Sequence, residues 1–212
     1  MIHPVFPSIR KDELIQLDLS VTGEHVAHID IFDTAQFTSY LFDEVLQGKV
    51  GIGGYLEHRN FYARSPHFET NTTDFRNIHL GIDIWTDAGR AIHAPLTGKV
   101  HSYANNTGYG NYGSTIILEH EWEGSVLYSL YGHLAAKSLA HISNLTKIDA
   151  GQCIGWLGHP EENGNWPPHL HFQFMYSMQE WKGDYPGVCS TKELPFYQSN
   201  CPNPMDFLRF TK

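Results

Sequence analysis

Histidine is the residue type that stands out in this sequence. The chain holds 14 histidines, as many as its lysines and arginines together. Imidazole is the commonest metal ligand and the usual acid–base group near neutral pH. Two motifs concentrate such groups, His79-Leu-Gly-Ile-Asp83 and His169-Leu-His171, and Gly81 with its β-branched neighbours favours a strand or turn over a helix for the first. Because side chains alternate along a strand, positions two or four apart share a face, so each motif can direct both of its groups to one metal.

His133 is a third candidate, in the strand-like run Leu130-Tyr-Gly-His133-Leu. Taken singly, each motif also fits an ordinary role, such as a surface histidine beside a turn aspartate or an exposed polar strand face. Together, two histidines and one carboxylate, with a fourth position left to water, form the donor set of a catalytic zinc site. A structural zinc site is usually closed by four ligands rich in cysteine, and the three cysteines lack that spacing. They are Cys153, Cys189 and Cys201, for which we expect isolated thiols in a reduced compartment, or at most one disulfide between Cys189 and Cys201.

One helix and a series of short strands must position these groups. Residues 34–47 carry apolar side chains at the spacing of one helix face, followed by Gly48 as a stop signal. From Gly51 onward, short β-branched and aromatic runs separated by Gly, Pro and Asn predict an all-β core. The runs cover residues 80–85, 98–103, 115–120, 126–133, 153–158 and 169–176. Residues 159–168 contain Asn-Gly and Pro-Pro pairs and predict a loop that contributes a wall of the site.

The order of these motifs resembles that of the lysostaphin-type zinc endopeptidases, the peptidoglycan-cleaving family built on the duplicated hybrid motif. The resemblance consists of His-x-x-x-Asp, then Tyr-Gly-His-Leu, then Pro-His-Leu-His-Phe, and it extends to the intervening residues 89–100, 110–120 and 151–158. Matched sequence runs from about residue 78 to 176. Each motif alone is weak, and the ordered combination carries the resemblance.

The resemblance implies a mainly β fold, a curled antiparallel sheet of the barrel-sandwich type, and the apolar spacing adds one N-terminal helix to it. It implies that His79, Asp83 and His171 bind Zn²⁺ and that His133 and His169 are catalytic residues that do not bind the metal. Since the chain contains no His-Glu-x-x-His motif, an imidazole must take the proton of water or stabilise the oxyanion, and the sequence does not divide these tasks between His133 and His169. Two positions that match cleft-lining sites of relatives are Tyr131 and Asn111. The histidines that match no ligand position, and for which we expect surface or edge roles, are His58, His67, His93, His101, His120, His141 and His159.

Three regions are expected along the chain. Residues 51–182 form the zinc peptidase core, residues 183–212 an irregular tail packed on that core, and residues 1–50 an extension with the helix. The extension lies outside the matched region, and it is left open whether it is a structural layer, an occluding segment or a docking surface.

Charge and composition limit the partners. The formal net charge is −9 and no cluster of basic residues stands out, so nucleic acid is not expected as a partner. The chain has no apolar run near the roughly 20 residues of a membrane span and no secretory signal at residues 1–20. We therefore expect a soluble, cytoplasmic protein, or a periplasmic or extracellular one if it is exported by another route.

The expected substrate is a peptide, as in peptidoglycan cross-links or stem peptides, and the oligomeric state is left open. Two alternatives share the fold, a non-enzymatic binding module and a histidine phosphocarrier, and metal content separates the enzyme from the carrier.

Overall fold

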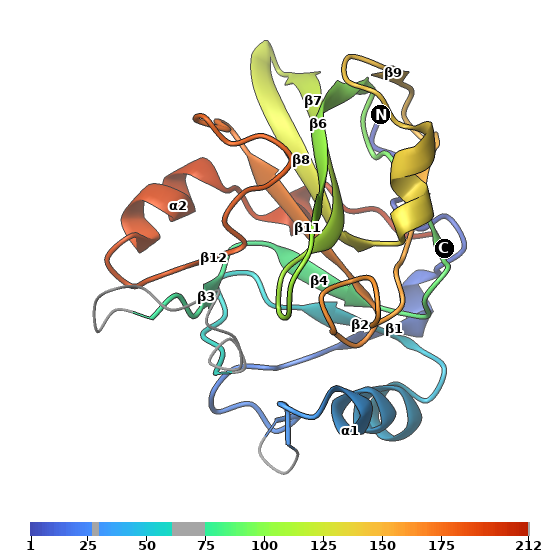
Figure 1. Cartoon of the computed structure of the whole chain (residues 1–212), viewed down its shortest axis with the longest axis vertical. Helices are drawn as coiled ribbons and strands as arrows, with labels where there is room; N and C mark the ends of the chain where they lie inside the picture. The colour runs from blue at the N-terminus through green and yellow to red at the C-terminus, as the bar shows by residue number, and fades with distance from the viewer. Residues whose placement is uncertain (27–29, 61–74, 212) are drawn as a thin grey trace.

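An open, mostly antiparallel sheet of eight strands forms the centre of the computed structural model, which describes residues 1–26, 30–60 and 75–211 (Figure 1). Its strand order is β1-β2-β4-β11-β8-β7-β6-β9, and the sheet is not closed into a barrel. Every pair in it is antiparallel except β1 with β2. The strands are β1 (Leu14–Gln16), β2 (Val50–Gly53), β4 (Ile82–Trp85), β6 (Gly98–Asn106), β7 (Gly113–Trp122), β8 (Ser125–Leu134), β9 (Lys147–Ile148) and β11 (His169–Met175). The prediction of a mainly β, antiparallel fold is confirmed.

Two small strand pairs complete the β structure. β5 (Ala91–His93) pairs with β10 (Cys153–Trp156), and β3 (Ile78–His79) pairs with β12 (Val188–Cys189). The second pair matters for the site, because it fixes the backbone of the first histidine motif beside the large sheet. Short 3-10 helices cover Lys11–Glu13, Ala136–His141 and Pro204–Asp206.

The two faces of the sheet differ in their residues. On one face Ile82 and Ile84 of β4 join Leu170 and Phe172 of β11 in the largest apolar cluster of the described residues. The alternate residues of the same strands, among them Asp83, face the other way, as the twofold periodicity of a strand requires. This second face carries two smaller apolar clusters, one around Trp85 and the N-terminal helix and one around Tyr185.

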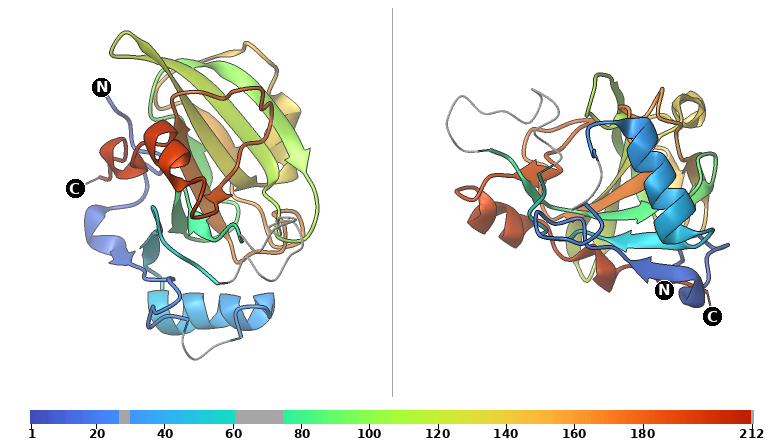
Figure 2. Two further views of the ribbon diagram at one scale, coloured as in Figure 1. Left: turned by 90° about the vertical axis from the view of Figure 1, so that its left-hand side faces the viewer. Right: turned by 90° about the horizontal axis from the view of Figure 1, so that it is seen from below.

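The N-terminal helix lies where the apolar periodicity places it. α1 (Thr34–Ser39) begins at Asp33, whose carboxylate accepts hydrogen bonds from the backbone N–H groups of residues 35 and 36, and it continues into a π-helical turn, Tyr40–Leu46. Gln47, at a φ of 48°, ends the helix in the left-handed region directly before Gly48. Phe37 of α1 is fully buried against Trp85, and the helix packs along one side of the sheet (Figure 2).

The N-terminal segment is thus an added structural layer. Its strand β1 extends the sheet beyond β2, and Leu17, Leu19 and Leu41 are buried in the cluster around Trp85. The two chain ends lie on the same side of the molecule, where Arg10 and Thr211 form an isolated bridge (Figures 1 and 2). Among the described residues, none of the helices has the length and apolar character needed to cross a membrane.

The prediction of an irregular tail was wrong for two segments after residue 183. Besides β12, the tail forms α2 (Leu194–Asn200), with a proline in its first turn. Proline signals a break when the sequence is read locally, but in the first turn its missing N–H costs no helical hydrogen bond. Tyr197 of α2 packs against Tyr185, so the helix covers the far end of the site face.

Candidate active site

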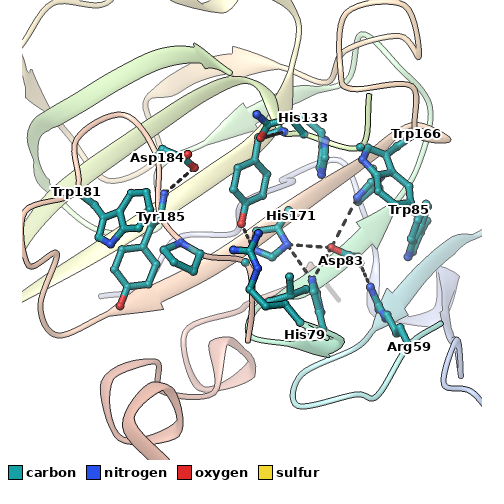
Figure 3. Close-up of a pocket in the computed structure, with 18 residues that line it drawn as sticks. Arg59, His79, Asp83, Trp85, His133, Trp166, His171, Trp181, Asp184 and Tyr185 are labelled. Atoms are coloured by element: carbon teal, nitrogen blue, oxygen red, sulfur yellow. Dashed lines mark hydrogen bonds and ion pairs between the residues drawn. The ribbon is translucent and has the colours of Figure 1, made fainter. Parts of the chain in front are cut away.

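Five predicted site residues converge on one face of the sheet, near the ends of four strands, and Figure 3 labels four of them, His79, Asp83, His133 and His171. The register of β4, β11 and β8 pairs His171 with Asp83 on one side and with Gly132 on the other. His79 reaches the same point from β3. Gly81 allows this close approach, because a Cβ at that position would lie 2.7 Å from the carbonyl oxygen of residue 172. The first motif is therefore two short strands joined at a glycine, consistent with the expected strand or turn.

Three side chains, His79, Asp83 and His171, form a cluster that can hold a metal ion. The Nε2 atom of His79 lies 2.9 Å from Nδ1 of His171, and each of these nitrogens lies 3.4 Å from Oδ1 of Asp83. All three residues are buried, with 2–3% exposure. Within the described residues this is the one cluster of His, Cys, Asp or Glu with such a geometry.

Hydrogen bonds on the outer side of the cluster fix which imidazole nitrogens carry protons. Nδ1 of His79 donates to the carbonyl oxygen of Gly54 at 2.9 Å. The Gln173 amide donates to the carbonyl oxygen of Pro186, so its Oε1 is the atom that accepts from Nε2 of His171 at 2.9 Å. The two inner nitrogens therefore present lone pairs to each other.

The arrangement of lone pairs fits a cation. Oδ1 of Asp83 is buried and accepts no hydrogen bond, while Oδ2 is held by Nη1 of Arg59 at 2.6 Å. Figure 3 shows the interactions of Asp83 with Arg59 on one side and with the two histidines on the other. Two neutral acceptor nitrogens and one carboxylate oxygen at these distances repel one another unless a positive charge lies between them. The donor set of two imidazoles and one carboxylate is that of catalytic zinc sites.

The electrostatics of the cluster keep it ready for a metal at neutral pH. Burial, with the adjacent Arg59 guanidinium, lowers the pKa of His79 to about 3. Burial alone would raise the pKa of the Asp83 carboxyl, but the neighbouring His79 and Arg59 outweigh it and hold that pKa well below its usual value. His79 is thus neutral and Asp83 ionised, the states that bind a metal.

His133 and His169 form a second pair of imidazoles beside the cluster. Their ring centroids are 4.2 Å apart, and Nε2 of His169 lies 3.8 Å from Oδ1 of Asp83. Nδ1 of His133 donates to the carbonyl oxygen of Asn163 and Nδ1 of His169 to that of Pro167, each at 2.8 Å. With Nδ1 protonated, the Nε2 atom of each ring is the acceptor. The predicted loop 159–168 supplies both carbonyl groups, so it orients the imidazoles as well as lining the site.

Burial keeps both of these imidazoles neutral. It lowers the pKa of His169 to about 4. Burial and the neighbouring His169 ring hold the pKa of His133 well below its usual value. His133 also has a left-handed backbone, with a φ of 62°, a conformation that costs energy for a residue other than glycine and is often found at functional sites. The two rings can therefore act as proton acceptors at neutral pH.

The cleft around these groups has aromatic walls. Trp85 stacks on His169 at 4.0 Å between ring centroids, and Trp166, Trp181 and Tyr185 line other parts of the cleft. Asn111, a predicted cleft residue, also lines it, and its Oδ1 accepts from the backbone N–H of residue 112.

Tyr131 does not line the cleft, so its predicted role as a cleft residue was wrong. Its side chain is fully buried in the main apolar cluster, where it contacts Phe172 and the hydroxyl of Ser129. The alternation of β8 is broken just after it, because the pairing of β8 with β7 shifts register near Gly132 and His133 has a left-handed backbone. Consequently Tyr131 and His133, two positions apart, point to different sides of the sheet.

Among the site residues that the sequence analysis did not predict, Tyr112 and Arg59 contact the proposed ligands. Tyr112 lines the cleft and places its hydroxyl 3.3 Å from Nε2 of His171, and its ring packs where a Cβ on Gly132 would lie. Arg59 is buried on Asp83. Neither residue belongs to a local motif with the ligands, so only the fold reveals them.

Of the remaining predicted histidines that the structure describes, none belongs to the metal cluster, and one departs from the expected surface or edge role. His120 is buried: its ring bonds to the carbonyl oxygen of Thr97 and to the hydroxyl of Ser129. His67 and the side chain of His141 lie outside the described part of the chain. The three cysteines are free, as expected, with Cys189 and Cys201 buried.

Comparison with known proteins identifies a family and several similar structures. Residues 77–183 match the model of peptidase family M23. Among solved structures, the chain is similar to the lysostaphin catalytic domain from Staphylococcus simulans (22% identity over 72% of this chain and 93% of that chain, TM-score 0.41). It is also similar to the solution structure of lysostaphin, with 27% identity over 58% of this chain and 44% of that chain and a TM-score of 0.37. A zinc containing peptidase from Vibrio cholerae is 27% identical over 52% of this chain and 31% of that chain, with a TM-score of 0.38.

The chain spans less than half the length of these last two proteins. No curated protein sequence matches it significantly. The region that matches the family model, residues 77–183, covers just over half of the 212 residues. It contains the three residues of the metal cluster and the pair His133 and His169. The chain therefore belongs to peptidase family M23.

Proposed function

We propose that this chain is a zinc-dependent endopeptidase that hydrolyses peptide bonds of peptidoglycan, in its cross-links or stem peptides. The observation that carries the proposal is the convergence of three lone-pair atoms, from His79, Asp83 and His171, without a proton between them. Membership of a peptidase family supports the reaction class. The resemblance to lysostaphin-type enzymes supports the choice of peptidoglycan as substrate.

The residues divide the chemistry between a metal and a pair of bases. When bound, zinc polarises the scissile carbonyl and lowers the pKa of water towards about 7. Nε2 of His133 or His169 accepts the proton that water loses as its oxygen bonds to the carbonyl carbon. The same nitrogen can return this proton to the amide nitrogen, which leaves as an amine when the C–N bond breaks. The carbonyl groups of Asn163 and Pro167 hold the two rings in the acceptor tautomer throughout.

Metal content is the decisive measurement. We expect about one zinc per chain in the purified wild type and little in His79→Ala and His171→Ala, because each variant leaves two ligands where catalytic sites have three. His159→Ala is the matched control. It removes an exposed imidazole from the loop 159–168 beside the site and should retain zinc. His133→Ala and His169→Ala should each keep zinc, and loss of whichever ring accepts the proton should abolish cleavage of peptidoglycan, glycine-rich peptides or D-alanyl peptides.

Two outcomes would contradict the proposal in different ways. A wild type that binds no zinc after reconstitution at neutral pH would exclude the metal site, and a phosphocarrier or a binding module would then explain the histidines better. A zinc-loaded wild type that cleaves none of the three substrates would leave the metal site intact and refute the proposed substrate class.

A further inference from the structure

Arg59 is a buried cation that joins the proposed metal site to the N-terminal layer. Its side chain is 1% exposed and lies between two carboxylates. Nη1 donates to Oδ2 of Asp83 at 2.6 Å, and Nε donates to Oε2 of Glu57 at 2.5 Å. Burying a guanidinium is costly unless it is paired with good geometry, so these two carboxylates help to set its position.

Glu57 connects this pair to the N-terminal segment. While Oε2 accepts from Arg59, Oε1 accepts from the backbone N–H of Leu19 at 3.1 Å. The backbone N–H of Val21 donates to the carbonyl oxygen of His58 at 2.9 Å. A continuous set of hydrogen bonds therefore runs from the segment after β1 to Asp83.

The same short stretch also orients His79. The backbone N–H of His79 donates to the carbonyl oxygen of Glu57, and that of Arg59 donates to the carbonyl oxygen of Asn77. The Gly54 carbonyl accepts from Nδ1 of His79, and a Cβ on Gly54 would collide with the Arg59 guanidinium. Residues 54–59 thus form the outer wall of the site, with contacts to two of its three proposed ligands.

We propose that Arg59, fixed by Glu57, is a positioning residue that aims Oδ1 of Asp83 at the metal and holds Oδ2 away from it. The inference rests on the proposed zinc site. A carboxylate has two equivalent oxygens, and a free one can turn or bind a metal through both. The bond from Nη1 to Oδ2 removes this freedom, so Asp83 contributes one oxygen and a coordination position stays open for water.

A pure charge effect would act in the opposite direction. A guanidinium this close repels a divalent cation, so if charge alone mattered, its removal would tighten metal binding. If positioning dominates, its removal weakens binding, since loss of an outer-shell partner of a metal ligand typically costs about 10–100-fold in affinity. The sign of the change therefore separates the two explanations.

The test measures metal affinity without using substrate. Competition titrations with a chelator give the Zn²⁺ affinity, and the visible absorption of the Co²⁺-substituted protein reports the coordination geometry. We expect Arg59→Met to weaken Zn²⁺ binding by about 10–100-fold and to shift the Co²⁺ bands. Arg59→Lys, which keeps the charge but cannot bridge two carboxylates with a planar fork, should recover only part of the affinity.

Two further variants guard against a trivial loss of folding. Glu57→Gln keeps the size of the side chain and the acceptor for Leu19 but removes the charge facing Arg59, and it should weaken Zn²⁺ binding in the same direction by a smaller factor. Leu96→Ala, in the cluster on the opposite face, lowers stability without touching Asp83 and should leave the Co²⁺ bands in place.

The outcomes are distinguishable. If the wild type binds no metal, the proposed function fails and the inference fails with it. If the wild type binds zinc and Arg59→Met binds it equally or more tightly, only the positioning role is refuted. If Arg59→Met does not fold, Glu57→Gln decides: unchanged affinity and unchanged Co²⁺ bands would overturn the inference.

Discussion

The role of the N-terminal helix as a structural layer can be tested at Phe37. This ring is fully buried, and its centroid lies 5.9 Å from that of Trp85, which in turn stacks on His169. Truncating a buried phenylalanine to alanine costs about 3–5 kcal/mol through lost burial and the cavity left behind. For a chain of this length, 1 kcal/mol corresponds to about 2–4 °C in Tm, so Phe37→Ala should lower Tm by about 6–20 °C.

Phe32 gives a matched control in the same segment. Its side chain is 50% exposed, and it interacts with Tyr109 through its backbone carbonyl, which a substitution retains. Phe32→Ala should therefore change the free energy of unfolding by no more than about 0.5 kcal/mol.

Urea unfolding followed by tryptophan fluorescence and circular dichroism measures both variants of this pair. The reasoning is refuted if Phe37→Ala costs less than about 1 kcal/mol, or no more than Phe32→Ala, because the helix would then contribute nothing to the core.

Three further predictions concern pH, a hydroxyl and the thiols. Lowering the pH of the metal-free protein from 6.5 to about 4 should reduce its free energy of unfolding, because His169 stays neutral in the fold while the same residue binds a proton in the unfolded chain. Urea titrations at several pH values measure this, and a free energy of unfolding that does not change with pH would contradict the prediction. Tyr112→Phe should lower kcat/KM by about fivefold, the loss of one ordinary hydrogen bond, with zinc content unchanged, and loss of zinc would show a different role. In the native protein a thiol reagent should modify Cys153 alone, because burial raises the pKa values of Cys189 and Cys201 to about 12; reaction of all three without denaturant would disagree with the structure.

Sequence patterns were informative wherever a local period decides the structure. The helix at 34–46 follows from apolar spacing, and His169 and His171 share a face because strand alternation is local. The metal cluster could also be anticipated, since both of its motifs are short, and the strands that hold Asp83 and His171 pair.

Long-range contacts and backbone irregularities were not accessible in this way. No spacing rule brings Arg59 onto Asp83, because the contact depends on how residues 54–59 fold back beside β3. Tyr131 was misplaced because a shift of register and a left-handed residue interrupt β8. α2 was missed because it is short and begins with a proline-containing turn.

The open sheet has a consequence for where this protein could associate with another chain. A sheet that does not close leaves two edges with unpaired backbone groups, which can template pairing with another chain. In the described sheet one edge is β1, with three residues. At the other edge β9 pairs with only Gly98 and Lys99 of the nine-residue strand β6, so most of β6 has a strand partner on one side alone. The β1 edge therefore offers few backbone groups to a second molecule, and the outer side of β6 is the edge at which another chain would pair.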